Sequence, residues 1–123
     1  MDRPEWIDTF PESLTAIATL TNNSRRGATG FAPVDAANPR ASNAYGQIVQ
    51  WSYRNDWTEP TFAWEMFALA GDPQNAATGS TIVGDKYGSP DGIYVAPSGR
   101  LWIQTDISGS TINSGAYAGF GNN

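Results

Sequence analysis

The groups in this sequence that could do chemistry are oxygen ligands, a few guanidinium groups and one amine. Neither cysteine nor histidine occurs, which excludes a disulfide framework, a thiol nucleophile and a Ser-His-Asp triad built from this chain. Arg3 and Glu5 flank a proline before any hydrophobic pattern has begun, and the one lysine, Lys86, precedes Tyr87. Guanidinium groups bind oxyanions in a forked geometry, and carboxylates bind hard cations.

Length and composition limit the classes of protein that these groups could serve. The chain has 123 residues, which fits one domain. Its net charge of -5 argues against a nucleic-acid surface, which needs clustered Lys and Arg. No apolar run is long enough to span a membrane, and no basic segment followed by an apolar one marks a secretory signal. The 13 glycines and 8 prolines favour short strands and turns over helices.

Three segments have the pattern of β-strands. Residues 14–20 (LTAIATL) are nearly alternating and rich in β-branched side chains, which suits a half-buried strand. Residues 46–54 alternate so that one side is largely apolar. Residues 61–71 have apolar side chains at period two, and although 65–70 would tolerate a helix, the flanking prolines and glycine favour a strand.

The remaining segments predict a long loop and a hairpin. Residues 21–43 are polar and interrupted by glycine and proline, which indicates a loop lying across one face. Residues 93–95 and 101–104 are short strand runs joined by Ala-Pro-Ser-Gly, the composition of a tight turn. The loop would connect the first two predicted strands, and the hairpin would follow the third.

These elements predict an all-β fold, namely a sandwich, a barrel or a propeller. A first four-stranded sheet would run from about residue 6 to 71, and a second would begin at about 82–106 and remain unfinished. The Gly- and Ser-rich residues 107–123 are expected to form a flexible tail. A single partial β-propeller of about one and a half antiparallel blades fits this order better than a sandwich.

Six motifs occur in order along the chain: MDRPEW, TLTNNSRRG, DAANPRASNAYGQIVQW, FALAGDP, SPDGIYVAPSGRLWIQTD and the terminal GFGNN. Together they resemble one family, the PhoX-type alkaline phosphatases. The resemblance implies an exported bacterial phosphomonoesterase (periplasmic or extracellular), a six-bladed propeller, and a central site with iron and calcium. Because such enzymes are several times longer, it also implies that this chain is an internal portion of one, bounded by a methionine that is interior in the family.

The resemblance also assigns roles to particular residues. It implies that Arg3 contacts the phosphate and that Glu5 is a metal ligand, both as catalytic residues, and that Lys86 and Tyr87 bind the substrate phosphate. In an extended segment residues i and i+2 point the same way, so Arg3 and Glu5 could address one ligand. Asp91 in the SPDG motif is a candidate calcium ligand, with a turn-capping role as the alternative.

The family's cysteine ligand to iron is missing here, together with other ligands that come from earlier blades. We therefore expect the chain to be inactive as a phosphatase on its own. One alternative is a non-catalytic β-module that folds by self-association, because a partial propeller exposes an apolar face and open strand edges. Another is a small metal- or carbohydrate-binding module. Neither nucleic acid nor a membrane is expected as a partner.

Overall fold

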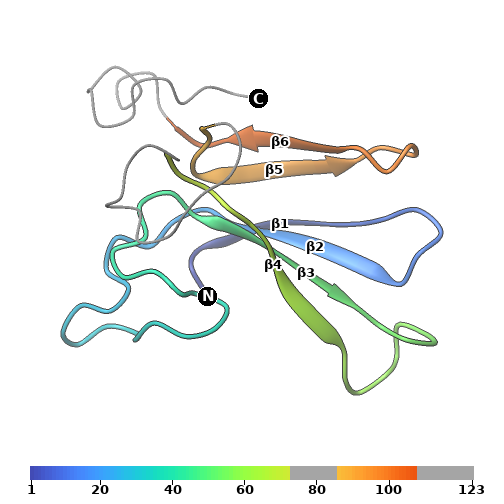
Figure 1. Ribbon diagram of the computed structural model, residues 1–123, viewed down its shortest axis with the longest axis horizontal. Helices are drawn as coiled ribbons and strands as arrows, with labels where there is room; N and C mark the ends of the chain where they lie inside the picture. The colour runs from blue at the N-terminus through green and yellow to red at the C-terminus, as the bar shows by residue number, and fades with distance from the viewer. Residues whose placement is uncertain (73–85, 108–123) are drawn as a thin grey trace.

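The computed structural model describes residues 1–72 and 86–107, and these form two antiparallel sheets without a helix (Figure 1). The first sheet has the order β1-β2-β3-β4, and the second pairs β5 with β6. The strands are β1 (Pro4–Thr9), β2 (Thr15–Leu20), β3 (Gln47–Ser52), β4 (Ala63–Leu69), β5 (Pro90–Val95) and β6 (Leu101–Thr105). No helix in these residues has the length and apolar character needed to cross a bilayer.

The strand predictions are confirmed, with small shifts of the bounds. The first sheet begins at Pro4, two residues before the expected start, and the segment that tolerated a helix is strand β4. The predicted hairpin is β5 and β6, closed by a turn in which Gly99 N–H donates to the Ala96 carbonyl at 2.8 Å. The expected second blade from residue 82 and the tail from 107 lie partly outside the described residues, at 73–85 and 108–123.

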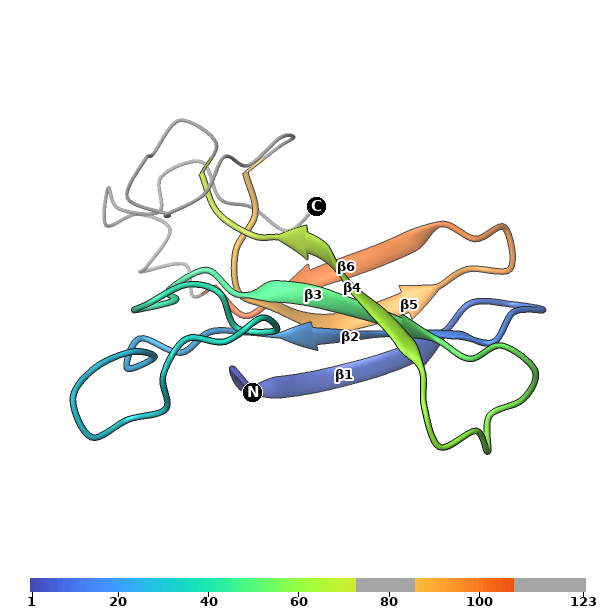
Figure 2. The ribbon, with the colours of Figure 1, turned by 60° about the horizontal axis from the view of Figure 1, so that its bottom comes forward.

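The β5–β6 sheet packs on one face of the larger sheet (Figure 2). Ile17 and Ile48 point from β2 and β3 toward Ile93 and Val95 of β5, and all four are at most 5% exposed. Burying large aliphatic side chains between two sheets stabilises the pair by about 1.5–3 kcal/mol per residue. One complete four-stranded blade and the first half of a second give the partial propeller that the sequence predicts.

The opposite face of the larger sheet is covered at one end only. Leu20 and Val49 are buried there, and Gln47 Nε2 donates to the Ala37 carbonyl of the long loop at 2.8 Å. Both faces of β3 are therefore buried at this end, whereas the alternation of its side chains predicted only one buried face. Beyond the loop this face is a groove of about 670 Å³. We call it the aromatic groove; its lining residues include Val49, Trp51, Tyr53, Phe62 and Trp64.

A buried ion pair joins the start of the chain to the long loop. Asp2 is fully buried, and its Oδ1 accepts hydrogen bonds from Arg26 Nε at 2.8 Å and from Asn23 at 3.0 Å. Its Oδ2 accepts from Asn43 Nδ2 at 3.1 Å, and its N–H donates to Asn38 Oδ1 at 2.9 Å. The segment that carries Arg3 is thus fixed by a satisfied polar network, as buried charges require.

Gly46 lets the loop return to the sheet beside the end of β2. Its φ is +79°, and a Cβ there would lie 2.2 Å from the Thr21 carbonyl oxygen and 2.4 Å from that of Leu20. Only glycine accepts both this backbone conformation and this contact. The buried guanidinium of Arg40 donates to the carbonyl of Gly46 and, at 2.6 Å, to that of Ala70. The loop therefore reaches the ends of β3 and β4.

Candidate functional site

The strands β1 and β5 begin, and β6 ends, at the same end of the two sheets (Figures 1 and 2). Four charged residues belong to this end: Arg3, Glu5, Asp91 and Asp106. Arg3 Nη2 lies 3.2 Å from Glu5 Oε1 and 3.5 Å from Asp106 Oδ2, and Nη1 donates to Asn22 Oδ1 at 3.2 Å. Asp91 is close enough to the other three to respond to their charges. The Arg3 side chain is 51% exposed, so an anion can reach it from solvent. We call these four residues the charged cluster.

The backbone that brings Arg3 and Glu5 together is not the extended segment predicted from the sequence. Arg3 has a φ of +46°, in the left-handed region, and the pairing of β1 with β2 shifts register between Pro4 and Ile7. A β-bulge of this kind redirects a side chain near a strand end. The two side chains do meet, but the i, i+2 alternation of an extended segment is not what brings them together. That they address one ligand stays a prediction.

A second bulge carries Asp91. The pairing of β5 with β6 shifts register between Pro90 and Ile93, around Asp91 and Gly92. Burial, followed by the negative charges of Glu5 and Asp106, raises the pKa of Asp91, and the charge of Arg3 opposes this effect. Both bulges contact the side chain of Thr19, so Glu5 and Asp91 extend from neighbouring segments of the two sheets.

Asp106 belongs to the charged cluster, although the sequence did not single it out as a site residue. Its N–H donates to the Ser89 carbonyl at 2.9 Å, directly after the pairing of Thr105 with Pro90. A register derived for the predicted hairpin would have placed Asp106 beside the SPDG motif. The pairing of the two predicted strands could therefore have indicated that Asp106 lies beside this motif.

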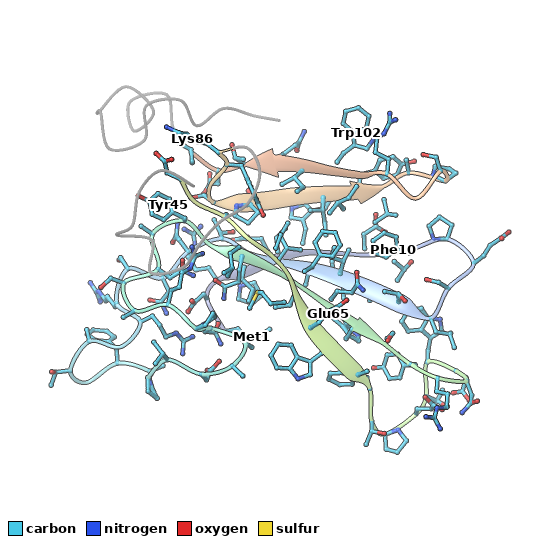
Figure 3. All side chains as sticks on the ribbon, viewed as in Figure 1. Met1, Phe10, Tyr45, Glu65, Lys86 and Trp102 are labelled. Carbon is cyan, nitrogen blue, oxygen red and sulfur yellow. The ribbon has the colours of Figure 1, made fainter. Side chains whose placement is uncertain are left out.

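Lys86 lies beside the end of β4 (Figure 3), and both Lys86 and Tyr87 have partners just after that strand. Lys86 Nζ lies 2.9 Å from Asp72 Oδ2, and the backbone of Tyr87 pairs with Gly71. The Tyr87 ring packs against the core between the sheets. Among the described residues its hydroxyl is buried without a hydrogen-bond partner. The predicted substrate-binding role of this pair therefore stays a prediction.

Replacing Tyr87 with phenylalanine is expected to leave stability at pH 7 unchanged or to raise it by up to about 1 kcal/mol, because it removes an unsatisfied buried hydroxyl. Burial raises the pKa of Tyr87 to about 12, against the opposing charge of Arg40. An unfolded tyrosine loses its proton near pH 10, so the folded state becomes less stable as pH rises from 10 to 12.

The measurement is urea unfolding of both proteins at pH 8, 10 and 11. From pH 10 to 11, the free energy of unfolding of the wild type should fall by about 1 kcal/mol relative to that of Tyr87→Phe. A phenylalanine variant that is destabilised at pH 7 would show that the hydroxyl has a partner. A phenylalanine variant that binds phosphate more weakly and has unchanged stability would favour the substrate-binding role of Tyr87.

The carboxylates of the charged cluster do not by themselves make a metal centre. Within residues 1–72 and 86–107, no group of three or more His, Cys, Asp or Glu side chains is arranged to hold a metal ion. Arg3 also lies between Glu5 and Asp106 and compensates their charge. The donor set described here therefore does not fit a complete iron or calcium site.

The fold and the charged cluster together describe one class of protein. It is a partial β-propeller with a half-exposed arginine at the end of its sheets, and carboxylates hold the guanidinium of that arginine. The family model described as alkaline phosphatase PhoX matches residues 1–122. The chain belongs to the PhoX alkaline phosphatase family, as its sequence motifs indicated.

A solved structure supports the same assignment. It is described as Pseudomonas fluorescens PhoX in complex with vanadate, a transition state analogue, and it is 45% identical with a TM-score of 0.85. The similarity covers 100% of this chain and 22% of that chain, so this chain spans about a fifth of the length of the solved one. The comparison with curated proteins finds no match.

Proposed function

We propose that this chain supplies the oxyanion-binding arginine of a PhoX-type phosphatase that hydrolyses phosphate monoesters. The observation that carries the proposal is the half-exposed Arg3 guanidinium, oriented by Glu5 and Asp106, in a chain of this family. A guanidinium can form two parallel hydrogen bonds to a phosphoryl group and stabilises the charge that develops on its oxygens. The vanadate complex of the similar protein supports this ligand class.

Glu5 and Asp106 would act first on Arg3 itself. Two carboxylates on one guanidinium fix its plane before the anion arrives, which lowers the entropy cost of binding. Glu5 and Asp91 are also the residues that this chain would contribute as metal ligands in an enzyme that uses calcium and iron. Because the described residues do not complete such a site, no step of the reaction is assigned to a metal here.

The proposal extends to the state of the isolated chain. We propose that it is a portion of a longer exported phosphatase and that it binds an oxyanion without turning over substrate, because its ligand set is incomplete. Incubation with a chromogenic phosphate ester, with and without added calcium and iron, should show no hydrolysis above the rate in buffer. Hydrolysis that is lost in the Arg3→Ala variant would contradict this part of the proposal.

Replacing Arg3 with glutamine is expected to weaken the binding of inorganic phosphate at least tenfold, because a charge-assisted hydrogen bond contributes about 1.5–3 kcal/mol. Affinity is measured by following the NMR shifts of the charged cluster as phosphate is added. The matched control is Arg54→Gln, which removes the same charge from an exposed turn. Equal loss in both variants would indicate a nonspecific charge effect, and no loss in Arg3→Gln would contradict the proposed site.

A second candidate function is that of a structural β-module that self-associates, and one observation favours it. The aromatic groove leaves Trp64 45% exposed and Phe62 53% exposed on one sheet face. Contiguous apolar surface of this kind is typical of a face that another molecule covers. We propose a second copy of this chain as the molecule that covers the groove.

A further inference from the structure

The two bulges create a hydrogen-bonding problem at the charged cluster. A bulge takes an extra residue out of the regular ladder, so its backbone groups lose their strand partners. This affects the β1 backbone around Glu5 and Trp6 and the β5 backbone around Asp91. Buried backbone N–H and C=O groups without partners are costly, so something else must satisfy them.

The hydroxyl of Thr19 satisfies one group from each bulge. It accepts a hydrogen bond from Trp6 N–H at 3.1 Å and donates to the Asp91 carbonyl at 2.7 Å. A longer contact of 3.4 Å runs to the Trp6 carbonyl, but a hydroxyl has one proton and the Asp91 carbonyl is the nearer acceptor. Thr19 is fully buried, so water does not compete for these groups. One oxygen atom therefore joins the bulge of Glu5 to the bulge of Asp91.

Thr21 repeats the arrangement two residues further along the same face. Its backbone N–H donates to the Arg3 carbonyl at 3.0 Å, and its hydroxyl donates to the Pro90 carbonyl at 2.9 Å. It is also fully buried. Thr21 thus connects the residue that carries the guanidinium to the residue that precedes Asp91.

Packing alone does not require these hydroxyls. Ile17 occupies the same face of β2, two residues before Thr19, and fills the space between the sheets with an apolar side chain. Valine has nearly the shape of threonine and would fill the other two positions equally well. Thr15, at the far end of this face, is only half-buried, whereas Thr19 and Thr21, beside the charged cluster, are fully buried.

We propose that Thr19 and Thr21 are positioning residues that set the separation and orientation of the two halves of the site, Arg3 with Glu5 on one sheet and Asp91 with Asp106 on the other. This inference rests on the proposed function of the charged cluster. It adds Thr19 of β2 and Thr21, which directly follows β2. Both act through backbone groups of the two halves and not on the ligand itself. They lie in the TLTNNSRRG motif, but the resemblance assigned them no role.

The test compares the double variant Thr19→Val/Thr21→Val with the wild type. The control is Thr15→Val, the same change on the same face at the far end of β2. We expect inorganic phosphate to bind about tenfold more weakly to the double variant, with the control unchanged. Trp6 N–H should exchange with solvent at least tenfold faster. Thr19→Ser/Thr21→Ser keeps both hydroxyls and should restore the affinity, which a loss of packing alone would not allow.

Two further outcomes separate this inference from the function on which it rests. If the wild type binds no phosphate, the proposed function fails. Residual dipolar couplings of the valine double variant then decide the inference: a changed orientation of the β5–β6 sheet relative to the β1–β4 sheet supports it, and unchanged couplings overturn it. If the wild type binds phosphate and the valine double variant binds it equally well, the positioning role is overturned while the proposed function stands.

Discussion

Replacing Arg26 with methionine is expected to lower the free energy of unfolding by about 3–5 kcal/mol, because it leaves a buried carboxylate without its countercharge. Arg26 Nη2 lies 2.7 Å from Asp2 Oδ1, and both side chains are almost fully buried. Methionine keeps an unbranched apolar stem, but it is shorter than arginine and also removes the hydrogen bond from Nη1 to the Pro33 carbonyl. Urea unfolding followed by tryptophan fluorescence measures the change.

The double variant Asp2→Asn/Arg26→Met is the informative control. It removes both charges, so it should recover a large part of the stability that Arg26→Met loses, and a double-mutant cycle gives the coupling between the two residues. Asp106→Asn breaks an exposed ion pair with Arg3 and should cost no more than about 1 kcal/mol. Equal losses for the buried and the exposed pair would show that the network around Asp2 does not hold the start of the chain.

Replacing Trp64 with glutamate is expected to weaken self-association at least thirtyfold, since a tryptophan at the centre of an interface contributes about 2 kcal/mol or more. Trp64 lines the aromatic groove, where Trp51 and Phe62 have ring centroids 6.5 Å apart. A carboxylate there would have to be desolvated without a partner. Sedimentation velocity over a range of concentrations measures the association.

The matched control is Trp102→Glu. Trp102 is 54% exposed and lies on the outer side of the β5–β6 sheet, where Arg100 lies 5.9 Å from its ring centroid (Figure 3). If both substitutions weaken association equally, the aromatic groove is not the interface. A wild type that stays monomeric at all concentrations would contradict the self-association candidate altogether.

The hairpin of β5 and β6 could be predicted from the sequence because its signal is local. A four-residue turn with proline and glycine between two short apolar runs determines the pairing without reference to the rest of the chain. The strands β2 to β4 were predictable for a similar reason, since a period-two alternation of side chains is a local pattern typical of a strand. Order and type of the elements therefore followed from the sequence alone.

The geometry of the site could not be predicted, because it depends on departures from regular structure. The two register shifts around Glu5 and Asp91 and the left-handed φ of Arg3 are imposed by tertiary contacts, which leave no periodic trace in the sequence. Asp2 and Arg26 likewise appear as two ordinary surface charges in the sequence. Their pairing is a contact across 24 positions, and only the folded loop reveals it.

The contact between Arg3 and Asp106 spans 103 positions of the chain, nearly its whole length. Loop closure over such a distance costs conformational entropy, which the packing of the second sheet on the first must offset. Glu5 and Asn22 can hold Arg3 from the side of the first sheet alone, but the contact with Asp106 requires both sheets. The full set of Arg3 contacts therefore forms only in a chain whose β5–β6 sheet is docked.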